Sequence, residues 1–327
     1  MSAPQKTKSG PAQIDVTVSA VVPITEFVTR FEFTRTDGAD FPPFSGGAHT
    51  VVTMQDGTRT RLNPYSLMSD PANLATYAIS VRREDEGRGG SVFMHSQVTQ
   101  GDAMTLTNPV NLFSLDLRAK KHIFFAGGIG ITPFLAMIGQ LELTNGNWEL
   151  HYASRTPENA AYADVLLAKF PTKVHVYYSS ANERIPLADV LNGQPLGSHA
   201  YVCGPERLIN GVHDTATGLG WPDTNVHSEE FLAPAAGAPF EVRLCKSDKT
   251  ITVGEHESLL EALEREGVDA PFLCRGGACG QCETDVVGGA GEFIHRDHWL
   301  DDEEQASGKK IMPCVSRYAG ELLEIDR

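Results

Sequence analysis

The sequence of 327 residues predicts a multidomain α/β plus β fold with three parts in a fixed order. An antiparallel β-barrel comes first, an α/β domain with a parallel sheet follows, and a small domain built around four cysteines ends the chain. Three observations predict this order. Short segments of alternating polarity fill the first third, apolar strands alternate with helical stretches in the middle, and a dense cysteine loop lies near the carboxyl end.

The first part, residues 13–115, has the pattern of a barrel. Apolar and polar residues alternate with a period of two, and turns rich in Gly, Pro and Asp separate the segments. The clearest expected strands are 14–18, 28–33, 49–54 and 77–81. A small antiparallel barrel is the expected product. Residues 1–12 are polar, lack the apolar region of a secretory signal and are expected to form a disordered tail.

The second part, residues 116–230, changes character. Apolar strands alternate here with helical stretches, and this alternation is typical of βαβ units around a parallel sheet. The expected strands are 122–126, 148–153, 174–178 and 200–203. Residues 231–239 are rich in Ala, Pro and Gly and are expected to be a linker.

The third part, residues 240–327, is expected to begin with a β-hairpin. Ser258 and Glu261 then have the spacing of a capping box that opens a helix over 259–267. The acidic run 301–304 is interpreted as the solvated start of another helix rather than as an acid/base pair.

Four cysteines carry the strongest chemical signal in the chain. Cys274, Cys279 and Cys282 follow a C-x4-C-x2-C spacing, and Cys314 lies in a separate apolar segment. This three-plus-one spacing is the ligand pattern of a plant-type 2Fe-2S cluster. Glycines between the ligands let the loop curl and turn its N–H groups toward sulfur. A structural zinc site is the alternative, although zinc sites usually present two separate C-x2-C pairs.

The remaining candidates for metal or disulfide chemistry are weaker. His295, Asp297 and His298 lie in a polar loop and are interpreted as exposed or turn residues rather than metal ligands. Cys203 and Cys245 are isolated thiols, so no disulfide framework is expected and a cytoplasmic location fits. The apolar stretch 122–141 contains several glycines and a proline, which argues against a membrane span.

The charge of the chain restricts its partners. The formal net charge of -15 argues against nucleic acid, whose phosphates would be repelled. Residues 240–327 hold 19 acidic and 10 basic residues, so the acidic surplus is concentrated in the cysteine-bearing part. Such a surface either steers the domain toward a basic patch on an acceptor protein or serves solubility.

A glycine-rich turn lies between an apolar strand and a helical run in the second part. Its key residues are Gly128, Gly130, Thr132 and Pro133. Glycine allows the backbone to approach a phosphate, proline suits a first helical turn, and a helix N-terminus attracts an anion. Because Pro133 stands where the Rossmann fingerprint has its third glycine, the turn alone is also compatible with an ordinary tight turn.

Two more motifs accompany this turn. Cys203-Gly204-Pro205 ends a later predicted strand, and Tyr65-Ser66-Leu67 lies in the barrel. Together with the cluster cysteines, these motifs make the chain resemble the phthalate dioxygenase reductase family, within the ferredoxin-NADP reductase-like flavoproteins. The resemblance covers nearly the whole chain from Ile14 onward. It implies a flavin-binding barrel, a nicotinamide-binding α/β domain and a β-grasp-like 2Fe-2S ferredoxin domain, in that order.

The resemblance also implies where flavin binds. Tyr65 and Ser66 match the Tyr-Ser pair of the family's R-x-Y-S motif, whereas Asn63 replaces its phosphate-binding arginine. Either Arg61, or Arg82 together with the segment 87–91 at a predicted helix start, is expected to bind the phosphate instead. That segment resembles the phosphate loop of FMN-binding members, so FMN is expected rather than FAD. The expected flavin residues are Arg61, Asn63, Tyr65, Ser66, Leu67, Ser80, Val81, Arg82, Gly87, Arg88, Gly89, Gly90 and Ser91.

The nicotinamide site is implied in the same way. The expected dinucleotide-binding residues are those of the glycine turn and of the later strand end: Gly128, Gly130, Thr132, Pro133, Cys203, Gly204 and Pro205. Glu229 and Phe231 match positions beside the flavin ring and, with Cys203, form the expected catalytic set. Arg155 is a candidate for holding the 2′-phosphate of NADPH, but the resemblance implies NADH.

These parts imply the reductase component of a multicomponent oxygenase. NADH gives up two electrons together and the cluster accepts one at a time, so the flavin has to divide the pair. The expected acceptor is a separate terminal oxygenase, most often a Rieske non-haem iron hydroxylase or demethylase. A haem monooxygenase as acceptor and a non-enzymatic redox-sensing module are the alternatives. The chain is expected to be a monomer when isolated.

Overall fold

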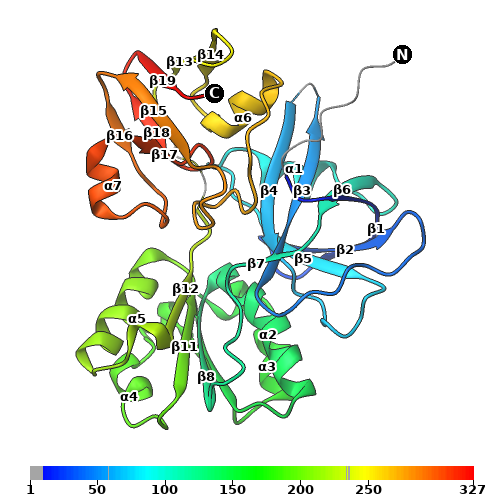
Figure 1. The fold of residues 1–327 in the computed structure, drawn as a ribbon. Coiled ribbons are helices and arrows are strands. Elements are labelled where there is room, and N and C mark those ends of the chain that lie inside the picture. The colour runs from blue at the N-terminus through cyan, green and yellow to red at the C-terminus, as the bar shows by residue number, and fades with distance from the viewer. Residues whose placement is uncertain (1–9, 58, 233, 235) are drawn as a thin grey trace. The chain divides into compact units, whose positions relative to one another are not determined.

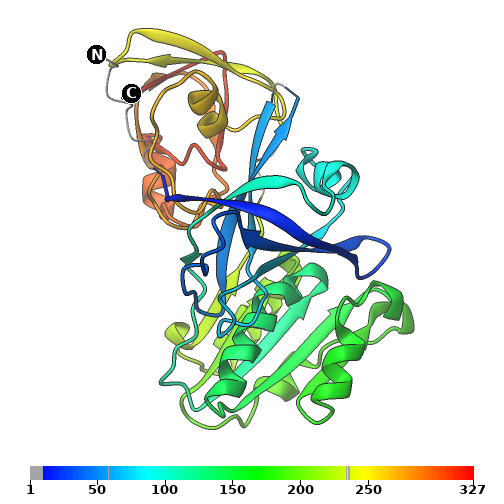
Figure 2. The same cartoon turned by 90° about the vertical axis from the view of Figure 1, so that its right-hand side faces the viewer.

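The computed structural model describes residues 10–57, 59–232, 234 and 236–327, and its described part forms two compact units (Figures 1 and 2). The larger unit is Gln13–Phe231, and the smaller unit is formed mainly by Leu232–Arg327. Most of the predicted disordered tail and two positions of the predicted linker, 233 and 235, lie outside the described residues.

The first half of the larger unit is a seven-stranded antiparallel sheet in the order β4-β3-β6-β1-β2-β5, with β7 beside β3. Figure 2 shows its strong curvature, and the expected barrel is confirmed in this form. The buried apolar residues of the curved sheet form one core. Helix α1 follows β5 along the chain. The elements are β1 (Gln13–Pro23), β2 (Val28–Arg35), β3 (Ala48–Asp56), β4 (Arg59–Ser66), β5 (Tyr77–Arg82), α1 (Gly90–Gln97), β6 (Ala103–Thr107) and β7 (Val110–Asn111).

The second half of the larger unit is a five-stranded parallel sheet in the order β10-β9-β8-β11-β12. Helices cover both faces (Figure 1), so β8 and β11 are buried almost throughout. Its strands are β8 (Lys121–Gly127), β9 (Trp148–Ser154), β10 (Val174–Tyr178), β11 (Ser198–Cys203) and β12 (Val226–Glu229).

Helices α2 and α3 pack on one face of this sheet, and α4 and α5 pack on the other. The helices are η1 (Gly128–Ile131), α2 (Thr132–Leu143), η2 (Pro157–Asn159), α3 (Ala163–Lys169), η3 (Ser179–Ala181), α4 (Leu187–Leu191), α5 (Glu206–Gly218) and η4 (Asp223–Asn225). Among the described residues, no helix combines the length and apolar character needed to cross a membrane.

The smaller unit has a five-stranded sheet in the order β14-β13-β19-β15-β17 and a separate pair, β16-β18. Capping boxes open both helices: Ser258 and Glu261 open α6, and Asp301 and Glu304 open α7. Both predicted helix starts are therefore confirmed. The elements are β13 (Phe240–Leu244), β14 (Lys249–Val253), α6 (Leu259–Arg265), β15 (Thr284–Gly289), β16 (Glu292–Ile294), α7 (Asp302–Ser307), β17 (Lys310–Ile311), β18 (Arg317–Ala319) and β19 (Leu322–Ile325).

Residues near the end of the predicted linker are attached to the smaller unit. The buried guanidinium of Arg317 donates hydrogen bonds to the carbonyl oxygens of Gly237 at 3.1 Å and Ala238 at 3.0 Å. Leu232 also packs against the core of the same unit. Composition alone does not reveal this, because backbone carbonyls accept hydrogen bonds whatever their side chains are.

Candidate functional site

The four predicted cluster ligands come together in the smaller unit as two pairs of thiols. Cys282 Sγ lies 3.3 Å from Cys314 Sγ, and the side chains of Cys274 and Cys279 hydrogen-bond each other. Among the described residues, no three His, Cys, Asp or Glu side chains gather around one ion position. Two pairs of thiols suit a centre with two irons, each bound by two cysteines.

The environment of these thiols favours thiolate at one member of each pair. The hydrogen bond from Cys279, together with backbone N–H groups such as that of Gly276, lowers the pKa of Cys274 to about 5. The hydrogen bond between Cys282 and Cys314 lowers the pKa of Cys282 and raises that of Cys314. Iron and zinc are both bound by thiolate rather than thiol, so the donor set fits a metal cluster.

The backbone of the cluster loop depends on residues that tolerate positive φ. Gly277 and Gly280 have φ of +76° and +73°. A Cβ on Gly280 would lie 2.3 Å from the indole of Trp299, and one on Gly277 would lie 2.8 Å from Val315. Arg275 adopts φ of +54° and is held by two hydrogen bonds of 2.7 Å to Glu264. This pair, in which the Arg275 side chain is buried and Glu264 is partly exposed, fixes the loop between the first two predicted ligands.

Asp297 lies in a loop, as expected, but it is buried beside the cysteine loop, so its interpretation as an exposed residue is wrong. Its carboxylate accepts hydrogen bonds from Ser316 Oγ at 2.8 Å and from the Leu300 backbone N–H at 3.0 Å. The side chain of His295 is also largely buried, 3.5 Å from Asp297, whereas His298 is exposed. The polar residues around Asp297 in the sequence suggested exposure. Its burial depends on the contact with Ser316, which is distant in the sequence.

The predicted flavin residues lie on β4, on β5 and at the start of α1. Strands β4 and β5 are the two ends of the curved sheet. Pro64 is tolerated within β4 because an end strand leaves one backbone edge without a partner strand. The structure therefore brings Asn63, Tyr65 and Ser66 onto one end strand and Ser80 and Val81 onto the other.

The expected phosphate segment meets Asn63 and Arg61. Gly89 has φ of +89° and lies against the guanidinium of Arg61, and a Cβ on Gly90 would lie 2.4 Å from the Asn63 amide nitrogen. Arg61 donates to the carbonyl oxygen of Arg88 and pairs with Asp56 at 2.7 Å. The hydroxyl of Ser91, in contrast, hydrogen-bonds the backbone of Glu84, and Arg82 is exposed.

Two buried polar atoms that face each other across β3 and β4 lack a hydrogen-bond partner among the described residues. They are Oγ of Ser66 and Nε2 of His49, and these two residues lie opposite each other on β4 and β3. Burial lowers the pKa of His49 to about 4 and, at the neighbouring Tyr65, raises the pKa to about 12. Buried polar groups without partners are typical of sites completed by a ligand or water. His49 is not among the predicted site residues, because its place in the alternating pattern of β3 is that of an ordinary barrel residue.

The glycine turn and the later strand end contact each other directly. A Cβ on Gly130 would lie 2.2 Å from the carbonyl oxygen of Cys203, and a Cβ on Gly204 would lie 2.9 Å from Gly127. Parallel strands β8 and β11 are neighbours, so their carboxyl ends meet at one edge of the sheet. Gly128, with φ of +54°, has open space around its Cβ position. Thr132 and Pro133 begin α2 directly after this turn.

The expected catalytic residues are a buried cysteine, a half-buried glutamate whose Oε2 atom is buried, and an exposed phenylalanine. Cys203 and Glu229 are cross-strand partners at the ends of β11 and β12. Burial raises the pKa of the Cys203 thiol well above its usual range and raises the pKa of Glu229 to about 8, and Oε2 of Glu229 has no partner among the described residues. Phe231 follows them and is 48% exposed.

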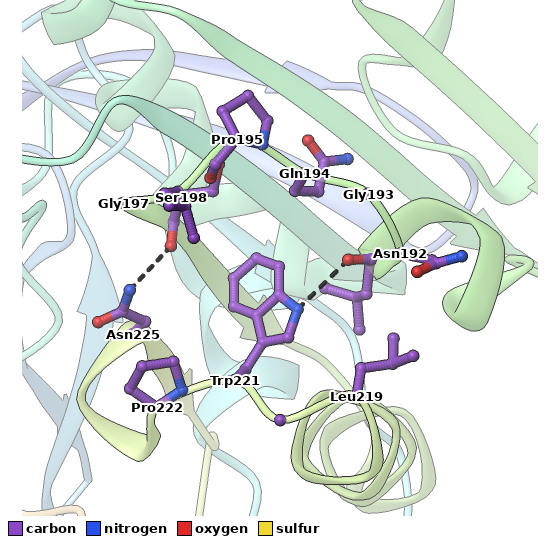
Figure 3. A pocket seen from close by; sticks show the side chains of 13 residues that line it. Asn192, Gly193, Gln194, Pro195, Gly197, Ser198, Leu219, Trp221, Pro222 and Asn225 are labelled. Atoms are coloured by element: carbon purple, nitrogen blue, oxygen red, sulfur yellow. Dashed lines mark hydrogen bonds between the residues drawn. The ribbon is translucent and has the colours of Figure 1, made fainter.

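A pocket of about 220 Å³ lies at the opposite end of β11 (Figure 3). Hydrogen bonds from Trp221 Nε1 to the Leu191 carbonyl at 3.3 Å and from Asn225 Nδ2 to the Ser198 carbonyl at 3.1 Å brace its walls. Ser198 begins β11 and Cys203 ends it, so this pocket is separate from the edge where the glycine turn lies. It holds none of the predicted site residues.

Comparisons with known proteins identify two domains and several relatives of this chain. Residues 242–319 match the 2Fe-2S iron-sulfur cluster binding domain, and residues 108–226 match the N-terminal domain of dimethylamine monooxygenase subunit DmmA-like proteins. The chain is 42% identical to the carnitine monooxygenase reductase subunit of Escherichia coli (95% of this chain, 98% of that one). It is also 42% identical to the heme-dependent oxidative N-demethylase beta subunit of Ectopseudomonas mendocina (96% and 98%).

A solved structure is similar over nearly the whole chain. It is that of phthalate dioxygenase reductase, described as a modular structure for electron transfer from pyridine nucleotides to a 2Fe-2S centre. The TM-score is 0.87 at 34% identity, covering 96% of this chain and 98% of that one.

Proposed function

This chain belongs to the phthalate dioxygenase reductase family, and from that premise we propose that it supplies single electrons to a terminal oxygenase that oxidises a nitrogen-bound alkyl group. Family membership makes it an NADH-dependent flavin and iron-sulfur oxidoreductase, the reductase component of an oxygenase system. The single observation that carries the electron path is the pairing of four thiols in the smaller unit.

FMN is the flavin that the proposal assigns to the curved sheet. Its phosphate would be held by the first N–H groups of α1, which has no acidic residue in its first turn, and by the Asn63 amide. Arg61 braces the loop, because its charge is already shared with Asp56 and its N–H groups with the Arg88 carbonyl. Tyr65 and Ser66 would lie against the ring, where Ser66 Oγ still lacks a partner among the described residues.

The nicotinamide would bind at the carboxyl edge of the parallel sheet. Gly128 and Gly130 leave the backbone open to a pyrophosphate, and the N-terminus of α2 faces the same turn. Bound flavin supplies the conversion of a two-electron donor into two single-electron steps. Burial raises the pKa of Glu229 to about 8, so near neutral pH its carboxyl group is protonated. The protonated carboxyl oxygen can then donate a hydrogen bond.

The relatives indicate which class of substrate the electron-accepting oxygenase oxidises. Carnitine and dimethylamine, named in the matching relatives, both carry nitrogen-bound methyl groups, and a third matching system is an N-demethylase. The carnitine monooxygenase reductase subunit and the N-demethylase beta subunit are each 42% identical to this chain, whereas the phthalate dioxygenase reductase of Burkholderia cepacia is 37% identical. A Rieske non-haem iron oxygenase is the first candidate acceptor. A haem-containing oxygenase is the second, favoured by the name of the Ectopseudomonas relative.

Reconstitution tests this proposal. The full-length protein would be mixed with NADH and, in separate reactions, with the oxygenase components of the carnitine, heme-dependent N-demethylase and phthalate systems. We expect product formation to be fastest with one of the first two components. Faster turnover with the phthalate component would contradict the proposed substrate class while leaving the reductase assignment intact.

We also propose that the protein works as a cytoplasmic monomer. None of the six cysteines, all of which lie among the described residues, forms a disulfide, which fits a reducing compartment. Light scattering of the purified holoprotein should give a mass near 35.4 kDa plus its cofactors. A mass of twice that value would contradict the monomer.

A further inference from the structure

Tyr162 links the two sheets of the larger unit through a partly buried contact. Its hydroxyl lies 2.5 Å from Ser80 Oγ and 3.6 Å from Met68 Sδ, and Ser80 donates to Met68 Sδ at 3.0 Å. Ser80 and Met68 are buried on the side of the curved sheet, whereas Tyr162 is the residue that precedes α3. A chain of three side chains therefore crosses from one half of the unit to the other.

The backbone of Tyr162 is held in an unfavourable conformation. Its φ is +65°, and only five described non-glycine residues have positive φ. Three of these are Asn or Asp, which tolerate the left-handed region, and the other two are Tyr162 and Arg275 of the cluster loop. For a bulky side chain this conformation costs on the order of 1–3 kcal/mol and persists only where surrounding contacts enforce it.

Both ends of this contact belong to the proposed redox site. Met68 directly follows Tyr65-Ser66-Leu67, and Ser80 lies on β5, the other end strand of the curved sheet. Tyr162 is carried by the loop that leaves the carboxyl end of β9, next to the end of β8 where the glycine turn begins. Nucleotides bind at this edge of a parallel sheet, so the contact ties the nucleotide edge to the flavin strands.

We propose that Tyr162 is a positioning residue for hydride transfer, with its hydroxyl setting the distance between the flavin strands and the nicotinamide edge. The inference rests on the proposed function. In that step the C–H bond of the reduced nicotinamide would break, its proton and both bonding electrons would pass together to the flavin ring as a hydride, and the nicotinamide would be left oxidised. Reacting atoms must approach to about 3–3.5 Å, and a displacement of about 1 Å can cost on the order of 100-fold in rate.

A second contact keeps the two halves together without Tyr162. The backbone N–H of Gly46 donates to Gln140 Oε1 of α2 at 2.8 Å, and a Cβ on Gly46 would lie 2.5 Å from the backbone of Met137. Removal of the Tyr162 hydroxyl is therefore expected to loosen the local fit without separating the halves. This makes the effect of the hydroxyl on chemistry measurable in a folded protein.

The experiment replaces Tyr162 by Phe in the full-length holoprotein and follows flavin bleaching by NADH in a stopped-flow instrument. We expect the limiting rate to fall at least about tenfold, with the dissociation constant of NADH changed less than about twofold. The long-wavelength absorbance of the nicotinamide–flavin contact should weaken in parallel. Ser80→Ala should give the same loss, and the double variant should lose no more than either single variant.

Tyr152→Phe is the matched control. Tyr152 is fully buried in the core that Tyr162 packs against, and its hydroxyl has no hydrogen-bond partner among the described residues. Its limiting rate, flavin content and melting temperature should equal those of the wild type, and Tyr162→Phe should keep its flavin content.

Three results would overturn the inference. They are a wild-type limiting rate in Tyr162→Phe, an equal loss in Tyr152→Phe, and losses that multiply in the double variant. Failure of the proposed function would be visible earlier and separately, because the wild-type flavin would then not bleach with NADH at all.

Discussion

The predicted cluster loop, residues 274–282, and the proposed nucleotide edge of the parallel sheet differ in how their residues are brought together. Three predicted cluster ligands lie within nine residues, and their spacing already indicates the chemistry. At the nucleotide edge, by contrast, Gly130 contacts Cys203 and Cys203 faces Glu229 only because β8, β11 and β12 are neighbours. The spacing of residues within a short segment can therefore be read from the sequence. Contacts that depend on the order of strands in a sheet cannot.

The comparison predicts the largest effect at the cluster. Cys314→Ser removes one ligand of the pair with Cys282, so we expect one-electron transfer to cytochrome c to fall on the order of 100-fold or more. Bleaching of the flavin by NADH should continue at the wild-type rate. Cys245→Ser, at an exposed thiol away from the ligand pairs, is the control and should change neither. Unimpaired cytochrome c reduction by Cys314→Ser would show that electrons leave by another route.

A smaller effect is expected where two strand ends meet. Gly130→Ala places a Cβ 2.2 Å from the Cys203 carbonyl oxygen, so the turn has to shift. We expect NADH-dependent flavin reduction to fall about tenfold or more, with the cluster spectrum unchanged. Gly139→Ala is the matched control, because Gly139 lies within α2 and its Cβ would come no closer than 3.7 Å to its nearest neighbour, the Pro71 side chain. That variant should keep the wild-type rate and gain up to about 1 kcal/mol in stability. Equal rates in the two variants would contradict the close approach.

The smallest effect concerns the buried carboxyl of Glu229. Its pKa is raised to about 8 in the folded protein, so between the ordinary value of 4.5 and 8 the folded state holds a proton that the unfolded state has lost. Stability should therefore fall as pH rises through this window, by at most about 1.4 kcal/mol per pH unit, and level off above pH 8. Thermal melting of Glu229→Gln from pH 5 to 8 should show a shallower decline than the wild type. Parallel curves would show that the carboxyl is not buried as described.

The same contrast explains how much the sequence could predict. The order of the parts, the sheet types, the capping box of Ser258 and Glu261, the helix start at the acidic run 301–304 and the three closely spaced cysteines of the predicted cluster follow from local patterns. The strand β4 lacks clear alternation and contains Pro64, which is tolerated only because β4 ends the sheet.

Several functional contacts could not be predicted because they join distant segments. The loop residue Asp297 is buried through its hydrogen bond to Ser316. His49 becomes notable only when Ser66 lies opposite it, and Tyr162 only when Ser80 meets its hydroxyl. Each of these contacts depends on tertiary placement rather than on residue type.

The central claim is that one polypeptide takes two electrons from NADH as a hydride and passes them on singly through a 2Fe-2S cluster. An anaerobic titration with NADH tests this claim most directly. A flavin takes two electrons and the cluster takes one, so we predict complete bleaching of both absorption bands at about 1.5 NADH per chain. Metal analysis of the same sample should find iron and acid-labile sulfide in equal amounts. Bleaching of the flavin alone at one NADH per chain, with zinc in place of iron, would contradict the account.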